Sequence, residues 1–197
     1  LSTLSSLFDV KDTTPAAYTL VDYGSVGFGE AGDRQAEWIN VVRTVDLLAP
    51  VIPAFLDNDN PEAVASRLRE ISSELIVADL VVVESRLRRL ETELKRAPRA
   101  ERVESEREQA LLVSLQEDLE AGNHLGGLEI GDRDRIVLSG FGFLTLKPAV
   151  VLINTGEGAV AGWDRLVGLV SEIWPYPNAA AAAISAQIEG EAHQLEP

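Results

Sequence analysis

The chain has 197 residues, 46% of them hydrophobic and 25% charged, a composition that fits a globular protein with one sizeable core, or a core plus an insert. Its formal net charge of −15 argues against a broadly basic surface that follows nucleic-acid phosphates, although a small basic patch remains compatible with it. The absence of cysteine excludes disulfides and thiolate metal sites, and no transmembrane run or signal peptide is present. These features fit a cytosolic protein. Because the chain begins with Leu1 and contains no Met, we expect a fragment or a trimmed product.

The first 45 residues contain signals for two helices and a strand. The apolar residues Leu1, Leu4, Leu7 and Phe8 recur at helical spacing, which predicts a short amphipathic helix. A strand is predicted at Tyr18–Val21, ending in Asp22, and a Gly-rich loop follows at Gly24–Gly32. A helix over about Asp33–Val45 would carry its apolar residues on one side: Trp38, Ile39, Val42 and Val45.

Asp22 has two interpretations. Asp and Gly are common where a strand ends in a turn, so Asp22 fits an ordinary turn residue. An Asp at the end of a strand is also where P-loop NTPases meet Mg²⁺, usually through water.

The stretch Leu47–Phe55 occupies the place of the next strand. Its residues Pro50 and Pro53 argue against a strand, because proline lacks the N–H of the hydrogen-bond ladder and is confined to edges or bulges.

Two long helices are predicted in the middle of the chain. Asn60-Pro61-Glu62 is typical of a helix start, and Val83, Leu87, Leu90 and Leu94 step by four, three and four residues, which is a heptad seam. Pro98 indicates a break. We therefore expect residues 63–96 and 101–121 to form an antiparallel coiled-coil hairpin that projects from the sheet, with charged outer faces that are most simply solvated.

The two histidines carry no metal signal. His124 lies in a Gly-rich turn and His193 on a predicted terminal helix, and neither has a Cys or a second His nearby. We expect both to be surface or capping residues, with no metal site.

The most informative stretch is Phe143–Glu157, with the sequence FLTLKPAVVLINTGE, after a predicted short helix at Ile130–Leu138. Ala149–Ile153 is a short apolar, mostly β-branched run typical of a buried strand. Asn154 and Glu157 follow its carboxyl end, where ligands bind in open α/β sheets. Asn offers a donor and an acceptor, whereas Glu offers acceptors, which suit the exocyclic amine of adenine. On the residues alone, a plain turn is the alternative.

Phe143–Glu157, the TLVD run ending at Asp22 and the helical hairpin together resemble the YchF / Obg-like ATPase family, a branch of the P-loop GTPases in which an NxxE loop favours ATP. The similarity covers nearly the whole chain and is densest at 68–94 and 141–157. It implies an α/β fold: a partial P-loop NTPase sheet of the Obg-type G domain, from residues 1–59 and 141–197, with a helical coiled-coil insert at 60–140. The residues of Trp163–Trp174 themselves predict an amphipathic helix. The resemblance implies a last strand at Ala179–Ile184, although poly-Ala is a poor strand former.

The resemblance implies a set of site residues. The base would be held by Asn154, Thr155, Gly156 and Glu157 together with a loop of Ser185, Ala186 and Gln187 that is similar to the family's SAK loop. The switch would comprise Asp22, Gly24 and Ser25, and Asp22 would also hold Mg²⁺ through water.

The chain departs from the family pattern at several positions. The family's DIAGL reads Asp22-Tyr23-Gly24-Ser25-Val26 here, so the switch glycine is either replaced by Ser25 or displaced by one position to Gly24. Val26 keeps the hydrophobic switch position, but no His occurs between Leu1 and Gly122, so the catalytic residue stays unassigned. The chain contains no G-x-x-x-x-G-K-[ST] loop. We expect that loop before residue 1 and a TGS domain after Pro197, and we expect the fragment alone to be inactive.

The resemblance thus implies an ATP- or GTP-binding and hydrolysing protein that uses Mg²⁺ and associates with the ribosome and translation. It implies neither base-specific reading of nucleic acid nor a membrane partner, and it leaves the oligomeric state open. The alternative is a degenerate, non-enzymatic interaction protein that binds a partner through the helical hairpin.

Overall fold

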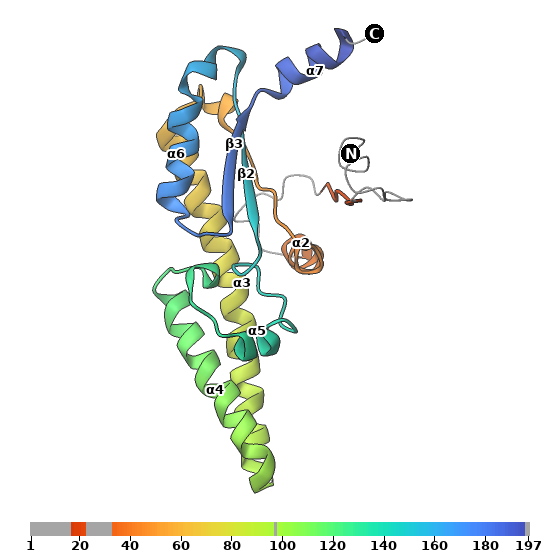
Figure 1. Ribbon diagram of the computed structural model, residues 1–197, viewed down its shortest axis with the longest axis vertical. Coiled ribbons are helices and arrows are strands. Elements are labelled where there is room, and N and C mark those ends of the chain that lie inside the picture. Colours follow the sequence, from red (N-terminus) through yellow and green to blue (C-terminus); the bar gives the residue numbers. More distant parts are fainter. Residues whose placement is uncertain (1–16, 23–32, 97, 196–197) are drawn as a thin grey trace, which may run out of the picture.

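A small parallel sheet and a long helical hairpin make up the described part of the protein (Figure 1). The computed structural model describes residues 17–22, 33–96 and 98–195. Its helices are α2 (Asp33–Thr44), α3 (Pro61–Arg96), α4 (Arg99–Glu120), α5 (Asp132–Leu138), α6 (Trp163–Ile173) and α7 (Ala186–Leu195). Its strands are β1 (Val51–Pro53), β2 (Ala149–Asn154) and β3 (Ala179–Ile184), and its short 3-10 turns are η1 (Ala54–Asp57), η2 (Leu125–Gly127) and η3 (Glu157–Gly162).

Strand β2 is the centre of the sheet, which has the order β1-β2-β3 with both pairs parallel. Burial alternates along β2, and Val151 and Ile153 are completely buried. They join a core cluster with α3 and α6, the two helices that lie against one face of the sheet in Figure 1. The strand predicted from the β-branched run is therefore confirmed.

Strand β1 is short because Pro50 precedes it and Pro53 ends it. The carbonyl of Pro50 still accepts the N–H of Leu152 at 2.8 Å, and Leu48 bridges to Ala149. Pro53 ends the strand, and η1 follows directly. The prolines shorten this segment without excluding it, since β1 lies at an edge of the described sheet, where proline is tolerated.

Strand β3 forms despite its five consecutive alanines. All six of its residues pair with β2, from Ala179 opposite Ala149 to Ile184 opposite Asn154. The intrinsic preference of alanine against strands is thus overridden by the partner strand and by packing against the core, which includes Ala181 and Ala183.

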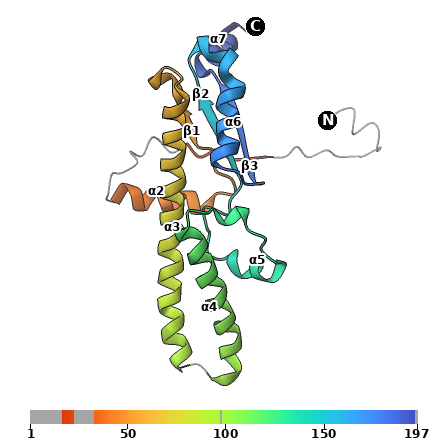
Figure 2. The ribbon, with the colours of Figure 1, turned by 90° about the vertical axis from the view of Figure 1, so that its left-hand side faces the viewer.

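Helices α3 and α4 lie side by side and run in opposite directions, joined by a short turn at Pro98, as Figure 2 shows. The helix start predicted at Asn60 is confirmed, since its Oδ1 accepts the N–H of Glu62 at 2.9 Å. A second buried cluster fills the hairpin and the base of α5: Ile76, Val83, Leu90, Leu112, Leu115, Leu119, Leu125, Leu138 and Phe143.

The buried carboxylate of Asp79 lies where the two clusters meet inside α3. It is completely buried and accepts three hydrogen bonds, from Leu144 N at 2.9 Å, Thr145 N at 2.8 Å and Thr145 Oγ1 at 2.9 Å. Burial raises the pKa of Asp79, and the donors of Thr145 and Leu144, together with the nearby charge of Arg43, oppose that rise. Because Asp79 accepts three hydrogen bonds from one segment, it connects α3 to the chain that leads to β2.

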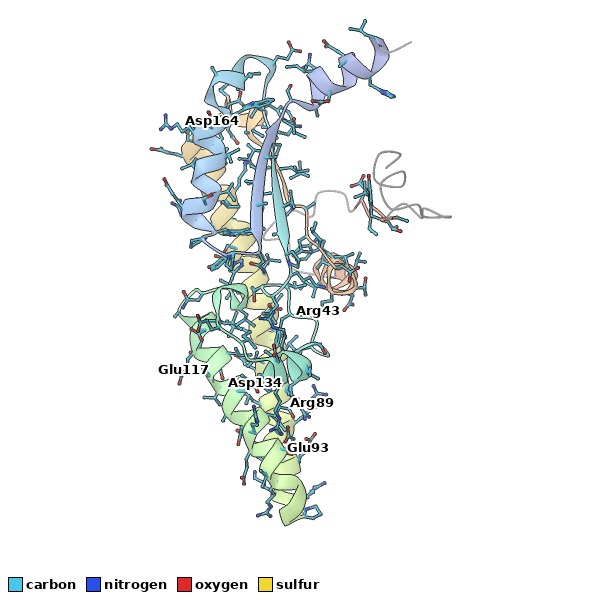
Figure 3. All side chains as sticks on the ribbon, in the orientation of Figure 1. Arg43, Arg89, Glu93, Glu117, Asp134 and Asp164 are labelled. Atoms are coloured by element: carbon cyan, nitrogen blue, oxygen red, sulfur yellow. The ribbon has the colours of Figure 1, made fainter. Side chains whose placement is uncertain are left out.

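Arg43, labelled in Figure 3, ties α2 to the same place. Its guanidinium lies 3.5 Å from Asp79 and donates to the carbonyls of Gly142 at 3.0 Å and Ala78 at 2.9 Å. Lys147 also connects its segment to the end of α2, because its ammonium group donates to the carbonyls of Arg43 and Val45. Helix α2, the middle of α3 and residues 142–147 are therefore joined by one set of polar contacts.

Two expectations for these elements are wrong. No strand forms at Tyr18–Val21: the segment has no regular structure, Tyr18 and Leu20 are 84% and 83% exposed, and it lies apart from the three strands in Figure 1. Without a neighbouring strand or a helix to cover it, an apolar run has no face to bury. The helix expected at Leu1–Phe8 and the loop at Gly24–Gly32 lie outside the described residues. None of the helices in residues 17–22, 33–96 and 98–195 combines the length and the apolar character that a membrane-spanning helix needs.

His124 is the second correction, because it is only 4% exposed. Its ring stacks on Tyr176 with centroids 4.7 Å apart, and Nε2 lies 2.7 Å from Ser72 Oγ on α3. The turn that carries it packs closely, since a Cβ at Gly126 would meet Asn178 at 2.6 Å. His193, by contrast, is exposed on α7, as expected.

We predict that Asp79→Ala destabilises the protein by at least about 2 kcal/mol, because it leaves three buried donors without an acceptor. Urea unfolding of the chain measures this. Glu91→Ala, an exposed carboxylate on the same helix, is the matched control and should change the free energy of unfolding by less than about 0.5 kcal/mol. An equal loss of unfolding free energy in the two variants would show that the contacts of Asp79 do not stabilise the fold.

His124 predicts a pH dependence of stability. Burial lowers its pKa from 6.5 to about 4, and the contact with Ser72 opposes the shift. The neutral ring is therefore favoured in the folded state. It contributes roughly 3 kcal/mol to the free energy of unfolding above pH 6.5, and this contribution is lost as the pH falls to about 4. In His124→Phe, the loss of unfolding free energy between pH 7 and pH 4 should shrink by that amount. His193→Phe should leave it as in the wild type, and the same curve for all three proteins would refute the assignment.

Candidate functional site

The carboxyl edge of the sheet brings together the two segments that the sequence assigned to base binding. Asn154 pairs with Ile184 in the register of β2 and β3, so the residues after each strand are neighbours. Asn154 Oδ1 accepts the N–H of Ala186, the first residue of α7, at 3.0 Å. This leaves the Nδ2 group of Asn154 to donate elsewhere.

Thr155 belongs to the framework of this edge. The residue is only 3% exposed. Its N–H and its hydroxyl both donate to the carbonyl of Ile184, at 2.8 and 3.1 Å, and Trp163 Nε1 donates to its Oγ1 at 2.8 Å. Because these groups are all engaged inside the protein, Thr155 fixes the loop and does not present its side chain to a ligand.

Ser185 is also a framework residue. It is 1% exposed, its hydroxyl lies 3.5 Å from the N–H of Ile188, and its carbonyl accepts the N–H of Glu189. Ala186 and Gln187, expected in a loop, are the first residues of helix α7. The loop expected at Ala186 and Gln187 is therefore wrong, because Ser185 lies directly before the helix, at a position where serine favours a helix start.

The exposed groups at the edge come from a few side chains. Glu157 is exposed at the start of η3, and Gln187 is exposed on α7, where its Nε2 lies 3.4 Å from Glu191. A carboxylate at position 157 accepts hydrogen bonds and the Asn154 amide donates, which matches the donor and acceptor on one edge of adenine.

Gly156 is held by a residue that the sequence reasoning did not assign to the site. Its N–H donates to the carboxylate of Asp59, with distances of 3.1 Å to Oδ1 and 3.3 Å to Oδ2. Asp59 lies between η1 and α3, in the run Asp57-Asn58-Asp59-Asn60. In the sequence, this run of consecutive Asp and Asn residues between a strand and a helix is the feature that indicates an unusual turn.

The predicted metal residue stands apart from this edge. Asp22 is exposed in the segment 17–22, which lies away from the strands in Figure 1. Its predicted switch partners Gly24 and Ser25, and Val26, lie outside the described residues. Residues 17–22, 33–96 and 98–195 contain no group of three His, Asp or Glu side chains able to hold a metal ion. One exposed carboxylate does not by itself supply the ligand set of Mg²⁺.

Comparison with known proteins supports the resemblance stated from the sequence. The chain is 27% identical over 206 residues to the ribosome-binding ATPase YchF of Bacillus subtilis, and 24% identical over 204 residues to the protein of that name from Haemophilus ducreyi. Both matches cover 100% of this chain but only 55% and 54% of the relatives, so the chain spans about half their length. No family model matches.

A solved structure gives the same result for the fold. The YchF GTPase of Schizosaccharomyces pombe matches with a TM-score of 0.74 and 21% sequence identity, over 99% of this chain and 55% of that one. The similarity to YchF proteins therefore extends over the whole chain, in sequence and in fold.

Proposed function

We propose that this YchF-like chain carries the base-binding part of a cytoplasmic protein that binds and hydrolyses ATP, and also GTP, in association with ribosomes. The observation that carries the proposal is the register of β2 and β3, which joins Asn154 to Ala186 and aligns the N-x-x-E loop with the start of α7. The names of the relatives, ribosome-binding ATPase and GTPase, support the wider role.

The polar groups at the edge favour adenine. In the proposed complex, Asn154 Nδ2 donates to a ring nitrogen and the Glu157 carboxylate accepts from the exocyclic amine. Guanine would direct a carbonyl oxygen at the same carboxylate, and two acceptors facing each other repel. Gln187 and the backbone at Ala186 would line the opposite side of the base.

The phosphates are not recognised by this part of the chain. Its sequence has no G-x-x-x-x-G-K-[ST] loop, which supplies the backbone cradle and the lysine for the phosphates in P-loop proteins. A base clamp acts equally on ground and transition states and therefore gives no rate acceleration. Mg²⁺ would bind beside the phosphates, where Asp22 would contact it through a water molecule. When bound there, the ion would neutralise phosphate charge.

We also propose a division into a nucleotide-binding domain, residues 1–59 and 141–197, and a helical insert, 60–140, that forms an antiparallel coiled coil. The packing separates two parts of α3: Leu68 and Leu75 join the sheet cluster, although they lie within the proposed insert, whereas Val83 and Leu90 join the hairpin cluster. The first turns of α3 thus act as the platform from which the hairpin projects.

The hairpin tip is the proposed contact with the ribosome. Within residues 88–102, six side chains are basic and three are acidic, in a chain with a net charge of −15. Lys95 and Arg96 are exposed in the last turn of α3, and Figure 3 labels Arg89 and Glu93 earlier in the same helix. A local basic tip on an acidic protein suits RNA phosphates at that one place.

A non-enzymatic interaction protein is the second candidate. It is favoured by Ser25 in place of the switch glycine and by the exposed segment 17–22, which joins no strand of the described sheet. In that case the hairpin would bind its partner whether or not nucleotide is present.

We predict that the 197-residue chain does not hydrolyse ATP measurably and binds adenosine weakly, with a dissociation constant of about 1 mM or above, which corresponds to about −4 kcal/mol. Guanosine should bind more weakly still. Glu157→Asp should shift preference toward guanosine, because the shorter carboxylate resembles the Asp that suits guanine in NKxD loops. Nucleoside titrations followed by NMR measure this.

The control for that titration is Glu172→Asp, an exposed glutamate on α6 that should leave the preference unchanged. ATP hydrolysis by the chain would contradict the proposal that these residues do not recognise the phosphates. A wild-type preference for guanosine would overturn the roles given to Asn154 and Glu157.

For the hairpin, we predict that the double variant Lys95→Glu, Arg96→Glu weakens co-sedimentation with ribosomes by about tenfold and lowers the slope of log affinity against log salt by about 2. The matched control is Arg69→Glu, Arg165→Glu, which makes the same change of charge at exposed positions on α3 and α6 away from the tip. Equal weakening by both pairs would indicate a general charge effect and refute the tip as the contact.

A further inference from the structure

The corner between η1 and α3 has an unusual backbone. Asn58 and Asp59 are consecutive non-glycine residues in the left-handed region, with φ of 53° and 56°. A non-glycine residue in this region is strained, and such strain gathers at functional sites. Asn and Asp tolerate this conformation better than other side chains, which explains why they occupy the corner.

Several contacts fix the corner from its own side. Asp59 N donates to the carbonyl of Ala54 at 2.9 Å, and Asn60 N donates to the carbonyl of Asp57 at 3.2 Å. Arg67, one helical turn and a half into α3, donates from Nε and from its terminal nitrogen to Asp57 Oδ2 at 3.1 and 2.7 Å. The backbone at Asp59, and with it the direction of its side chain, is therefore fixed by the 3-10 turn η1 and the helix α3 together.

The Asp59 carboxylate reaches across 97 residues of sequence to the loop after β2. Its two oxygens lie 3.1 and 3.3 Å from the N–H of Gly156, and a hydrogen bond to an ionised acceptor is stronger than one between neutral groups. The fit is close on both sides, since a Cβ at Gly156 would lie 3.2 Å from Asp59 Oδ2.

We propose that Asp59 is the positioning residue of the base-binding loop, which holds Gly156 so that the flanking side chains of Asn154 and Glu157 face the ligand. This inference rests on the function proposed for Asn154–Glu157. The loop is already fixed at Asn154 by Ala186 and at Thr155 by Ile184 and Trp163. Asp59 supplies the remaining anchor, on the side of the loop that leads to Glu157.

Two consequences follow for recognition. The N–H of Gly156 is occupied from within, so a bound base cannot use it as a donor. The Asp59 carboxylate also adds a second negative charge near Glu157, which favours ligand edges that donate and disfavours edges that present a carbonyl. Asp59 thus contributes to a preference for adenine over guanine while touching neither.

The test compares Asp59→Gly and Asp59→Asn with the wild-type chain. Glycine accepts the left-handed backbone without strain and removes the carboxylate, so the fold should remain while the Gly156 anchor is lost. Asparagine keeps the shape and one acceptor oxygen. Asp164→Asn, an exposed carboxylate at the start of α6 that Figure 3 labels, removes the same charge without touching Gly156 and is the matched control.

The first readout is hydrogen exchange of the Gly156 amide, measured by NMR, which needs no ligand. Exchange should become at least about tenfold faster in Asp59→Gly, a factor that corresponds to the loss of one hydrogen bond. It should be largely restored in Asp59→Asn and unchanged in Asp164→Asn. An unchanged Gly156 exchange rate in Asp59→Gly would overturn the inference.

The second readout is the ratio of adenosine to guanosine affinity, which a purely structural residue would not alter. We expect Asp59→Gly to lower this ratio by about threefold to tenfold, and Asp59→Asn by less. A wild-type ratio in Asp59→Gly would overturn the role in recognition even if Gly156 exchanges faster. If the wild-type chain binds neither nucleoside, the proposed function fails, whereas the exchange of Gly156 still decides whether Asp59 positions the loop.

Discussion

The parallel pairing of β2 with β3 is the constraint on which the site depends. It places Asn154 opposite Ile184, so two segments about thirty residues apart leave the sheet at the same edge. The pairing is stable because Val151 and Ile153 bury their side chains completely against α3 and α6. Fully burying such a side chain contributes about 1.5–3 kcal/mol, which is more than the weak strand preference of alanine in β3 opposes.

The same packing explains how the hairpin is attached. Helix α3 begins against the sheet and ends in the hairpin, so it is shared by both buried clusters. Asp79 lies where these clusters meet and collects donors from the segment that leads into β2, and Arg43 adds helix α2. A buried carboxylate with three hydrogen bonds fixes one arrangement, because any displacement leaves charged or polar groups unpaired. The carboxyl edge of the sheet and the hairpin are therefore connected through one continuous helix, α3, which is held near its middle by the polar contacts of Asp79.

Much of this fold follows from local sequence signals. The β-branched run at 149–153 predicts β2, the Asn-Pro-Glu start predicts α3, and Pro98 separates α3 from α4, because each signal acts within a few residues. β3 was expected only from the resemblance, since its alanines become a strand through pairing with β2. The strand at Tyr18–Val21 and the surface position of His124 were wrong for a related reason: both depend on neighbours distant in sequence. For the site, Asn154 and Glu157 stand out because they follow a strong strand, whereas Asp59 does not, since its role requires a contact across 97 residues.

The proposal that the edge formed by β2, β3 and α7 recognises adenine is tested by the backbone amide chemical shifts of the chain as adenosine is added. We expect saturable shifts to concentrate at Gly156, Glu157, Ala186 and Gln187, and guanosine at equal concentration to produce much smaller ones. Shifts spread over the hairpin, or none at this edge at saturating adenosine, would contradict it.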